Sequence, residues 1–106
     1  MGANLKKEVN GNNVISNIPE EFALGQNYPN PFNPSTKIEY QLPAKGNVTL
    51  RIYDILGRLV STLVDKEQDP GYYNVTWDAS KYASGIYIYA IQSGSFTSTK
   101  KLILLK

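Results

Sequence analysis

The sequence predicts an all-β fold, an immunoglobulin-like antiparallel β-sandwich of about seven strands. Segments of strand length with alternating apolar and polar residues recur at short intervals along the chain. The segments between them are rich in glycine, proline, asparagine and aspartate, which are the residues of turns. No stretch has the spacing of an amphipathic helix, and a regular series of short strands is typical of a sandwich.

Composition limits the classes of function. The chain has 106 residues, which favours one domain with a modest core. It contains no cysteine and no histidine, so it lacks thiolate ligands, disulfides, and the commonest general base and metal ligand. The net charge of +2, without a basic block, gives no indication of nucleic-acid binding. No apolar run approaches the roughly 20 residues that span a bilayer, and the first residues lack the apolar core of a signal peptide.

The chain divides into a tether and a domain. Residues 1–21 are rich in asparagine and charge, which indicates a linker that contains at most one short strand, and Met1 and Gly2 are consistent with a cloning remnant. Residues 22–106 form the predicted domain, which begins with a short apolar edge strand at Phe22–Leu24. We expect the whole to be the C-terminal part of a longer protein.

Residues 27–36, called the strap below, contain three prolines at Pro29, Pro31 and Pro34. Proline fixes φ and removes a backbone donor, so this segment is predicted to be stiff, extended and excluded from the middle of a sheet. Its rings, Tyr28 and Phe32, are costly to leave in water and are expected to anchor it. The side chains of Asn30 and Asn33 are expected to form Asx turns.

The first strands after the strap alternate clearly. Residues 37–42 and 48–53 are predicted strands, and residues 54–57 have the preferences of a type I turn. The expected inward residues are Ile38, Tyr40, Leu42, Val48, Leu50 and Ile52. Residues 59–64 form a further strand whose inward face the pattern does not decide, and residues 65–71 are expected to be a polar loop.

The second half of the domain contains the most β-prone sequence. Residues 72–78 and 85–91 are predicted strands, residues 78–85 a loop with one helical turn, and residues 96–105 the last strand after a turn at 92–95. The expected inward residues are Tyr73, Val75, Trp77, Tyr87, Tyr89 and Ile91.

Candidate residues for chemistry are few. Four carboxylates stand at strand ends or turns, where capping is the favoured interpretation and a weak calcium site the alternative: Asp54, Asp65, Asp69 and Asp78. No serine has a histidine partner, and neither a Gly-x-Ser-x-Gly motif nor a phosphate-binding loop is present. The tyrosines fall in strands, which favours core packing over a sugar-binding platform. We therefore predict no catalytic residue, no metal site and no cofactor.

Four motifs in order resemble the type A C-terminal sorting domain of the type IX secretion system (the Por secretion system sorting domain). They are Asn27-Tyr28-Pro29-Asn30-Pro31-Phe32-Asn33-Pro34, Ile52-Tyr53-Asp54-Ile55-Leu56-Gly57-Arg58, Ala83-Ser84-Gly85-Ile86-Tyr87, and Lys100-Lys101-Leu102-Ile103-Leu104-Leu105-Lys106. The resemblance runs from about Phe22 to Lys106. The part from Tyr53 to Asp78 is also similar to the immunoglobulin-like domain of flagellar hook-capping proteins.

The resemblance implies that the domain is a non-catalytic export signal at the C-terminus of a secreted protein. The implied partners are an outer-membrane translocon, a surface sortase-like protease that cuts before Phe22, and an N-terminal cargo domain, without nucleic acid or membrane insertion. The implied location is the cell surface or the extracellular space after transit through the periplasm. The recognition residues carried over are Tyr28, Pro29, Asn30, Pro31, Gly85, Tyr87, Lys100, Lys101 and Lys106.

A stiff strap and a terminal strand are expected to leave exposed backbone edges, to which a partner can bind by adding a strand.

Two other classes of function stay open. A carbohydrate-binding module requires at least two coplanar exposed tyrosines on one face, and a structural spacer requires no ligand.

Overall fold

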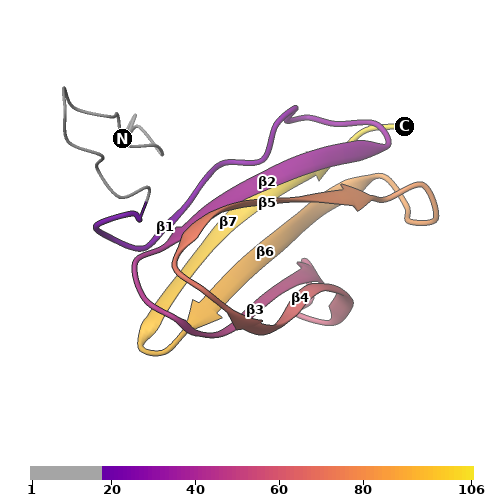
Figure 1. Cartoon of the computed structure of the whole chain (residues 1–106). Helices are drawn as coiled ribbons and strands as arrows, with labels where there is room; N and C mark the ends of the chain where they lie inside the picture. The colour runs from indigo at the N-terminus through magenta and orange to yellow at the C-terminus, as the bar shows by residue number, and fades with distance from the viewer. Residues whose placement is uncertain (1–17) are drawn as a thin grey trace, which may run out of the picture.

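A computed structural model describes residues 18–106, so the predicted tether lies largely outside the described residues. The described chain forms seven strands and no helix (Figure 1). These are β1 (Ala23–Leu24), β2 (Ser35–Leu42), β3 (Gly46–Asp54), β4 (Leu59–Gln68), β5 (Gly71–Asp78), β6 (Gly85–Ser93) and β7 (Phe96–Leu104). None of residues 18–106 belongs to a helix that could cross a membrane.

The strands form two antiparallel sheets that pack as a sandwich. One sheet has the order β1-β2-β5 and the other the order β4-β3-β6-β7. Figure 1 shows the two sheets as layers that cover one another along their length. The predicted fold class is therefore confirmed, including the number of strands.

The core consists of the inward faces that the alternation predicts. Side chains of β2, β3, β6 and β7 that are fully buried include Ile38, Leu42, Val48, Leu50, Ile52, Tyr89, Leu102 and Leu104. On β5 only Trp77 is buried, while Tyr73 and Val75 are half-buried and pack against the core. This difference arises because β5 is an edge strand, which has neighbours on one side only.

The β3–β4 hairpin has the predicted turn. The amide of Gly57 donates to the Asp54 carbonyl oxygen at 3.0 Å, and Gly57 has φ of +82°, a region that favours glycine. Asp54 Oδ1 also accepts hydrogen bonds from the amides of Leu56 and Arg58, both at 2.9 Å. These bonds, first that from the Arg58 amide, lower the pKa of the Asp54 carboxyl below its usual value.

Two predictions in this region need correction or completion. The expected polar loop at residues 65–71 is wrong, because β4 continues to Gln68 and leaves only Asp69 and Pro70 between strands. Charged side chains are tolerated there because β4 is an edge strand whose outer face meets water. The undecided strand buries Val64 against the core, with Val60 and Leu63 half-buried.

The loop between β5 and β6 holds a single turn in which the Tyr82 amide donates to the Ala79 carbonyl oxygen at 3.0 Å. Asp78 caps it by accepting a hydrogen bond from the Ser80 amide at 2.9 Å. This bond is the main reason that the pKa of Asp78 is lowered.

Candidate recognition surface

The strap connects the two sheets at one side of the sandwich. Tyr28 exchanges two backbone hydrogen bonds with Lys37 of β2, each 2.9 Å long. Further along, the Phe32 amide donates to the Ile103 carbonyl oxygen and the Leu105 amide to the Phe32 carbonyl oxygen, again at 2.9 Å. The strap thus pairs with β2 of one sheet and then, in parallel orientation, with the end of β7 of the other.

The two rings of the strap have opposite environments. Phe32 is buried, with its ring centroid 5.7 Å from that of Trp77. Tyr28 is 80% exposed, so the prediction that it anchors the strap is wrong. The reason is its pairing with Lys37, an outward-facing residue, because side chains directly opposite one another in a sheet lie on the same face.

A buried polar network holds the start of the strap. The Asn27 amide donates to the hydroxyl oxygen of Tyr89 at 2.8 Å, and that hydroxyl donates to the Gly25 carbonyl oxygen at 2.6 Å. The Asn27 side chain donates to Thr36 Oγ1 at 3.0 Å and to the Pro29 carbonyl oxygen at 3.1 Å. Burial raises the pKa of Tyr89 to about 12, although the bond from the Asn27 amide opposes the shift.

The same network shows what the sequence did not reveal. Asn27 is almost completely buried, yet an asparagine in a proline-rich segment is typical of an exposed turn. The available signal was Tyr89, because a tyrosine predicted in mid-core needs a hydrogen-bond partner for its hydroxyl group.

The edge of β7 is covered at its end rather than open. Asn30 Oδ1 accepts a hydrogen bond from the Ile103 amide at 3.0 Å, and the Gln26 side chain donates to the Lys101 carbonyl oxygen at 2.9 Å. Together with the Phe32 bonds, these contacts occupy outward backbone groups of Lys101, Ile103 and Leu105, which strand addition at this end would use. The expectation of a free edge here is therefore wrong, as is the expected Asx turn at Asn30, and Asn33 forms no side-chain hydrogen bond within residues 18–106.

The structure brings the other predicted recognition residues to the same end of β7. Gly85 pairs with Leu104 and Tyr87 with Leu102 in the β6–β7 ladder. The Tyr87 ring is buried and its hydroxyl donates to the Ala83 carbonyl oxygen at 2.6 Å. Tyr87 therefore supports the fold and is not available on the surface.

The lysines of the last strand differ in exposure. Lys101 is exposed, and Lys100 is half-buried. Lys106 is exposed but held, because its ammonium group donates to the Ser80 carbonyl oxygen at 2.7 Å and its amide to Ser84 Oγ at 3.1 Å. The predicted residues that remain on the surface are Tyr28, Pro29, Asn30, Pro31, Gly85, Lys101 and Lys106.

Two shallow hollows flank the exposed ring of Tyr28. One, of about 350 Å³, is lined by Gln26, Tyr28, Lys37 and Glu39. The other, of about 320 Å³, is lined by Tyr28, Pro29, Ser35, Thr36, Lys37 and Thr76. Tyr28 and Lys37 therefore line both hollows, on the outer face of the three-stranded sheet.

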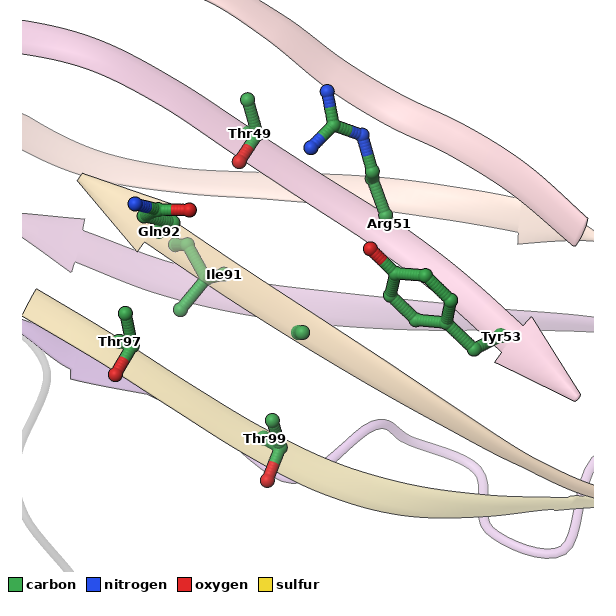
Figure 2. A pocket seen from close by; sticks show the side chains of 8 residues that line it. Thr49, Arg51, Tyr53, Ile91, Gln92, Thr97 and Thr99 are labelled. Atoms are coloured by element: carbon green, nitrogen blue, oxygen red, sulfur yellow. The ribbon is translucent and has the colours of Figure 1, made fainter. Parts of the chain in front are cut away.

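A third hollow, of about 100 Å³, lies on the outer face of the four-stranded sheet (Figure 2). It is lined by Thr49, Arg51, Tyr53, Ala90, Ile91, Gln92, Thr97 and Thr99. Tyr53 is its one aromatic residue, and Tyr28 is the one aromatic residue of the hollows beside the strap. None of the three brings together the two exposed tyrosines that a sugar platform requires.

Three of the four carboxylates have local structural partners, and Asp69 forms its contact through its backbone. Asp54 and Asp78 cap turns, as the favoured interpretation predicted, and Asp65 lies 3.9 Å from the guanidinium of Arg51. The Asp69 carbonyl oxygen accepts a hydrogen bond from the Tyr73 hydroxyl at 2.6 Å. Nowhere in the described part of the chain do three acidic residues gather as metal ligands would.

Comparisons with known proteins agree with this architecture. A family model described as "Secretion system C-terminal sorting domain" matches residues 26–105. Among solved structures, dimeric latent PorU from Porphyromonas gingivalis has a similar fold, with a TM-score of 0.58 and 22% sequence identity. That match covers 88% of this chain and 10% of the PorU chain, so this chain spans about a tenth of that protein. No curated protein matches the chain.

Proposed function

Because the chain belongs to the family of secretion-system C-terminal sorting domains, we propose that the strap and the adjoining end of β7 are the surface by which it is recognised. The domain is a C-terminal signal for type IX secretion, and it directs an attached protein to the cell surface or the extracellular space. The proposed recognition residues are Tyr28, Pro29, Asn30, Pro31, Gly85, Lys100, Lys101 and Lys106, with Tyr87 in a supporting role.

The observation that carries this proposal is the exposed Tyr28. The Tyr28 side chain is 80% exposed, so its burial contributes little to the stability of the fold. Its backbone is nevertheless fixed by two hydrogen bonds to β2. A rigid aromatic side chain that projects from a stiff segment is the usual form of an interface hot spot, because little entropy is lost when it enters a partner's pocket. Lys101 and Lys106 would add positive charge to the same end of the molecule.

The proposal extends to the partners of the domain. We propose that the outer-membrane translocon binds this surface after the protein has crossed the periplasm, and that a sortase-like protease then cuts in the linker before Phe22. In this scheme the cargo lies N-terminal to the linker. The domain itself is a substrate of the machinery and performs no catalysis.

The test is export of a fluorescent protein that carries residues 3–106 at its C-terminus and a signal peptide at its N-terminus. The host is a type IX-competent bacterium, compared with a secretion-deficient strain. Cargo on the surface or in the medium of the competent strain alone supports the sorting function. Retention in the periplasm of both strains contradicts it and favours the spacer.

The recognition surface is tested in the same assay by Tyr28→Ala. We expect surface cargo to fall at least tenfold with unchanged thermal unfolding, because the Tyr28 side chain is outside the core whereas its backbone pairing is retained. Tyr53→Ala, on the opposite sheet, is the matched control and should export normally. Equal export of both variants would place recognition elsewhere.

A further inference from the structure

Besides β1, which has only two residues, the edge strands are β4, β5 and β7, and they differ in how well they are protected against strand addition. β4 carries Asp65, Lys66 and Glu67, and its pairing with β3 is interrupted by two register shifts. β7 carries Lys100 and Lys101 and is covered by the strap at its end. Charges, bulges and covering segments are the usual means of blocking an edge.

β5 has none of these protections within the described structure. Its sequence, Gly-Tyr-Tyr-Asn-Val-Thr-Trp-Asp, contains no lysine, arginine or proline, and its one charge stands at the last position. Its eight residues pair with β2 without any register shift. β5 is therefore a regular, nearly uncharged edge, the kind that templates another strand.

The hydrogen bonds of β2 determine which backbone groups of β5 face outward. The Ala79 amide donates to the Pro34 carbonyl oxygen, which continues the β2–β5 ladder by one pair. On the other side of β2, Lys37 and Glu39 bond to Tyr28 and Gly25. Because bonding direction alternates along a strand, odd-numbered residues of β5 bond to β2. The amides and carbonyls of Tyr72, Asn74 and Thr76 therefore point away from the sheet.

We propose that β5 pairs with β5 of a second copy of the chain, in antiparallel orientation, and joins the two three-stranded sheets into one of six strands. A second copy supplies the required partner by itself, since it offers the same uncharged edge. With Val75 on the two-fold axis, Asn74 lies opposite Thr76 and Tyr72 opposite Asp78, so no like charges meet.

This arrangement has a geometric consequence. A two-fold axis perpendicular to the sheet keeps both outer faces on the same side. Thr76 is paired with Lys37, which is paired with Tyr28, so each Tyr28 lies two strands from its β5. Five inter-strand steps then separate the two Tyr28 positions, about 24 Å across the joined sheet, in addition to any offset along the strands. The dimer would present both rings to one partner.

The test measures the mass of the full chain by sedimentation equilibrium from micromolar to millimolar concentration. We expect a reversible monomer–dimer equilibrium that Thr76→Lys weakens at least tenfold. Thr97→Lys is the matched control, because Thr97 is also an exposed threonine on an edge strand, on β7, and it should leave the equilibrium unchanged. Circular dichroism confirms that both variants are folded.

Amide hydrogen exchange identifies the surface. The amides of Tyr72, Asn74 and Thr76 should become protected as concentration rises, while those of β4 do not change. A monomer of 11.8 kDa at every concentration would overturn the proposal. A dimer that leaves these three amides unprotected, or that Thr97→Lys disrupts instead, would overturn it as well. The proposal concerns self-association alone, so its failure is distinct from a failure of export.

Discussion

The hydroxyl group of Tyr89 links the core of the sandwich to the segment that enters the strap. It lies on a completely buried ring, accepts from the Asn27 amide and donates to the Gly25 carbonyl oxygen. Tyr89→Phe leaves both backbone groups without this partner, and a buried polar group without a partner costs roughly 1–3 kcal/mol. We expect a loss of this size in urea unfolding, with Tyr53→Phe as an almost neutral control.

The same residue predicts how stability changes in alkali. The pKa of Tyr89 is about 12 in the folded protein, against an ordinary value of about 10. The unfolded chain therefore loses the proton first as pH rises, and the stabilisation that is complete below pH 10 is lost between pH 10 and 12. Tyr89→Phe lacks this loss, so its stability should approach that of the wild type across that range. A constant difference between the two proteins would contradict the prediction.

At the scale of elements, the strap and β7 form one unit. β7 pairs with a segment that lies more than 70 residues earlier in the chain. The pairing consists of the bond from the Ile103 amide to Asn30 and the two backbone hydrogen bonds of Phe32. Asn30 is exposed, so its removal should loosen the end of β7 without unfolding the domain.

Asn30→Ala is expected to increase the exchange rate of the Ile103 amide several-fold. Its effect on the global free energy of unfolding should stay at about 1 kcal/mol or less, since a typical exposed hydrogen bond contributes no more. Asn33→Ala is the matched control, because Asn33 is also an exposed asparagine of the strap and immediately precedes a proline, as Asn30 does. Unchanged exchange at Ile103 in Asn30→Ala would show that the Phe32 bonds alone hold the strand.

At the scale of the whole molecule, β7 completes the core. Leu102 and Leu104 of β7 are fully buried, and Phe32, which is also buried, pairs with Leu104. A chain that ends at residue 100 should therefore show no cooperative thermal transition and no near-ultraviolet dichroism from Trp77. Deletion of Lys106 alone should preserve both signals. A folded 1–100 chain would mean that the first half of β7 is sufficient.

The limits of sequence interpretation are clear at particular residues. Alternation identified the inward faces of β2, β3 and β6 correctly, because a half-buried strand repeats with period two. The prediction ended β4 at residue 64, because residues 65–68 are mostly charged and charged residues are also typical of loops. It could not show that Tyr28 faces water or that Asn27 is buried, because the prolines break the period that relates neighbouring side chains. The proposed recognition surface depends on those residues.

The pairing of Phe32 with Leu104 also concerns biosynthesis. The segment that locks the strap is the last part of the domain to leave the ribosome, and the strap waits for it through some 70 residues of translation. Until that strand is released from the exit tunnel, Phe32 has no strand to pair with, although Tyr28 can already pair with β2. A protein whose synthesis stops before β7 would therefore lack the paired strap and β7 that we propose as the recognition surface. Under the proposed recognition surface, secretion would therefore be restricted to polypeptides that have been translated to the end of the domain.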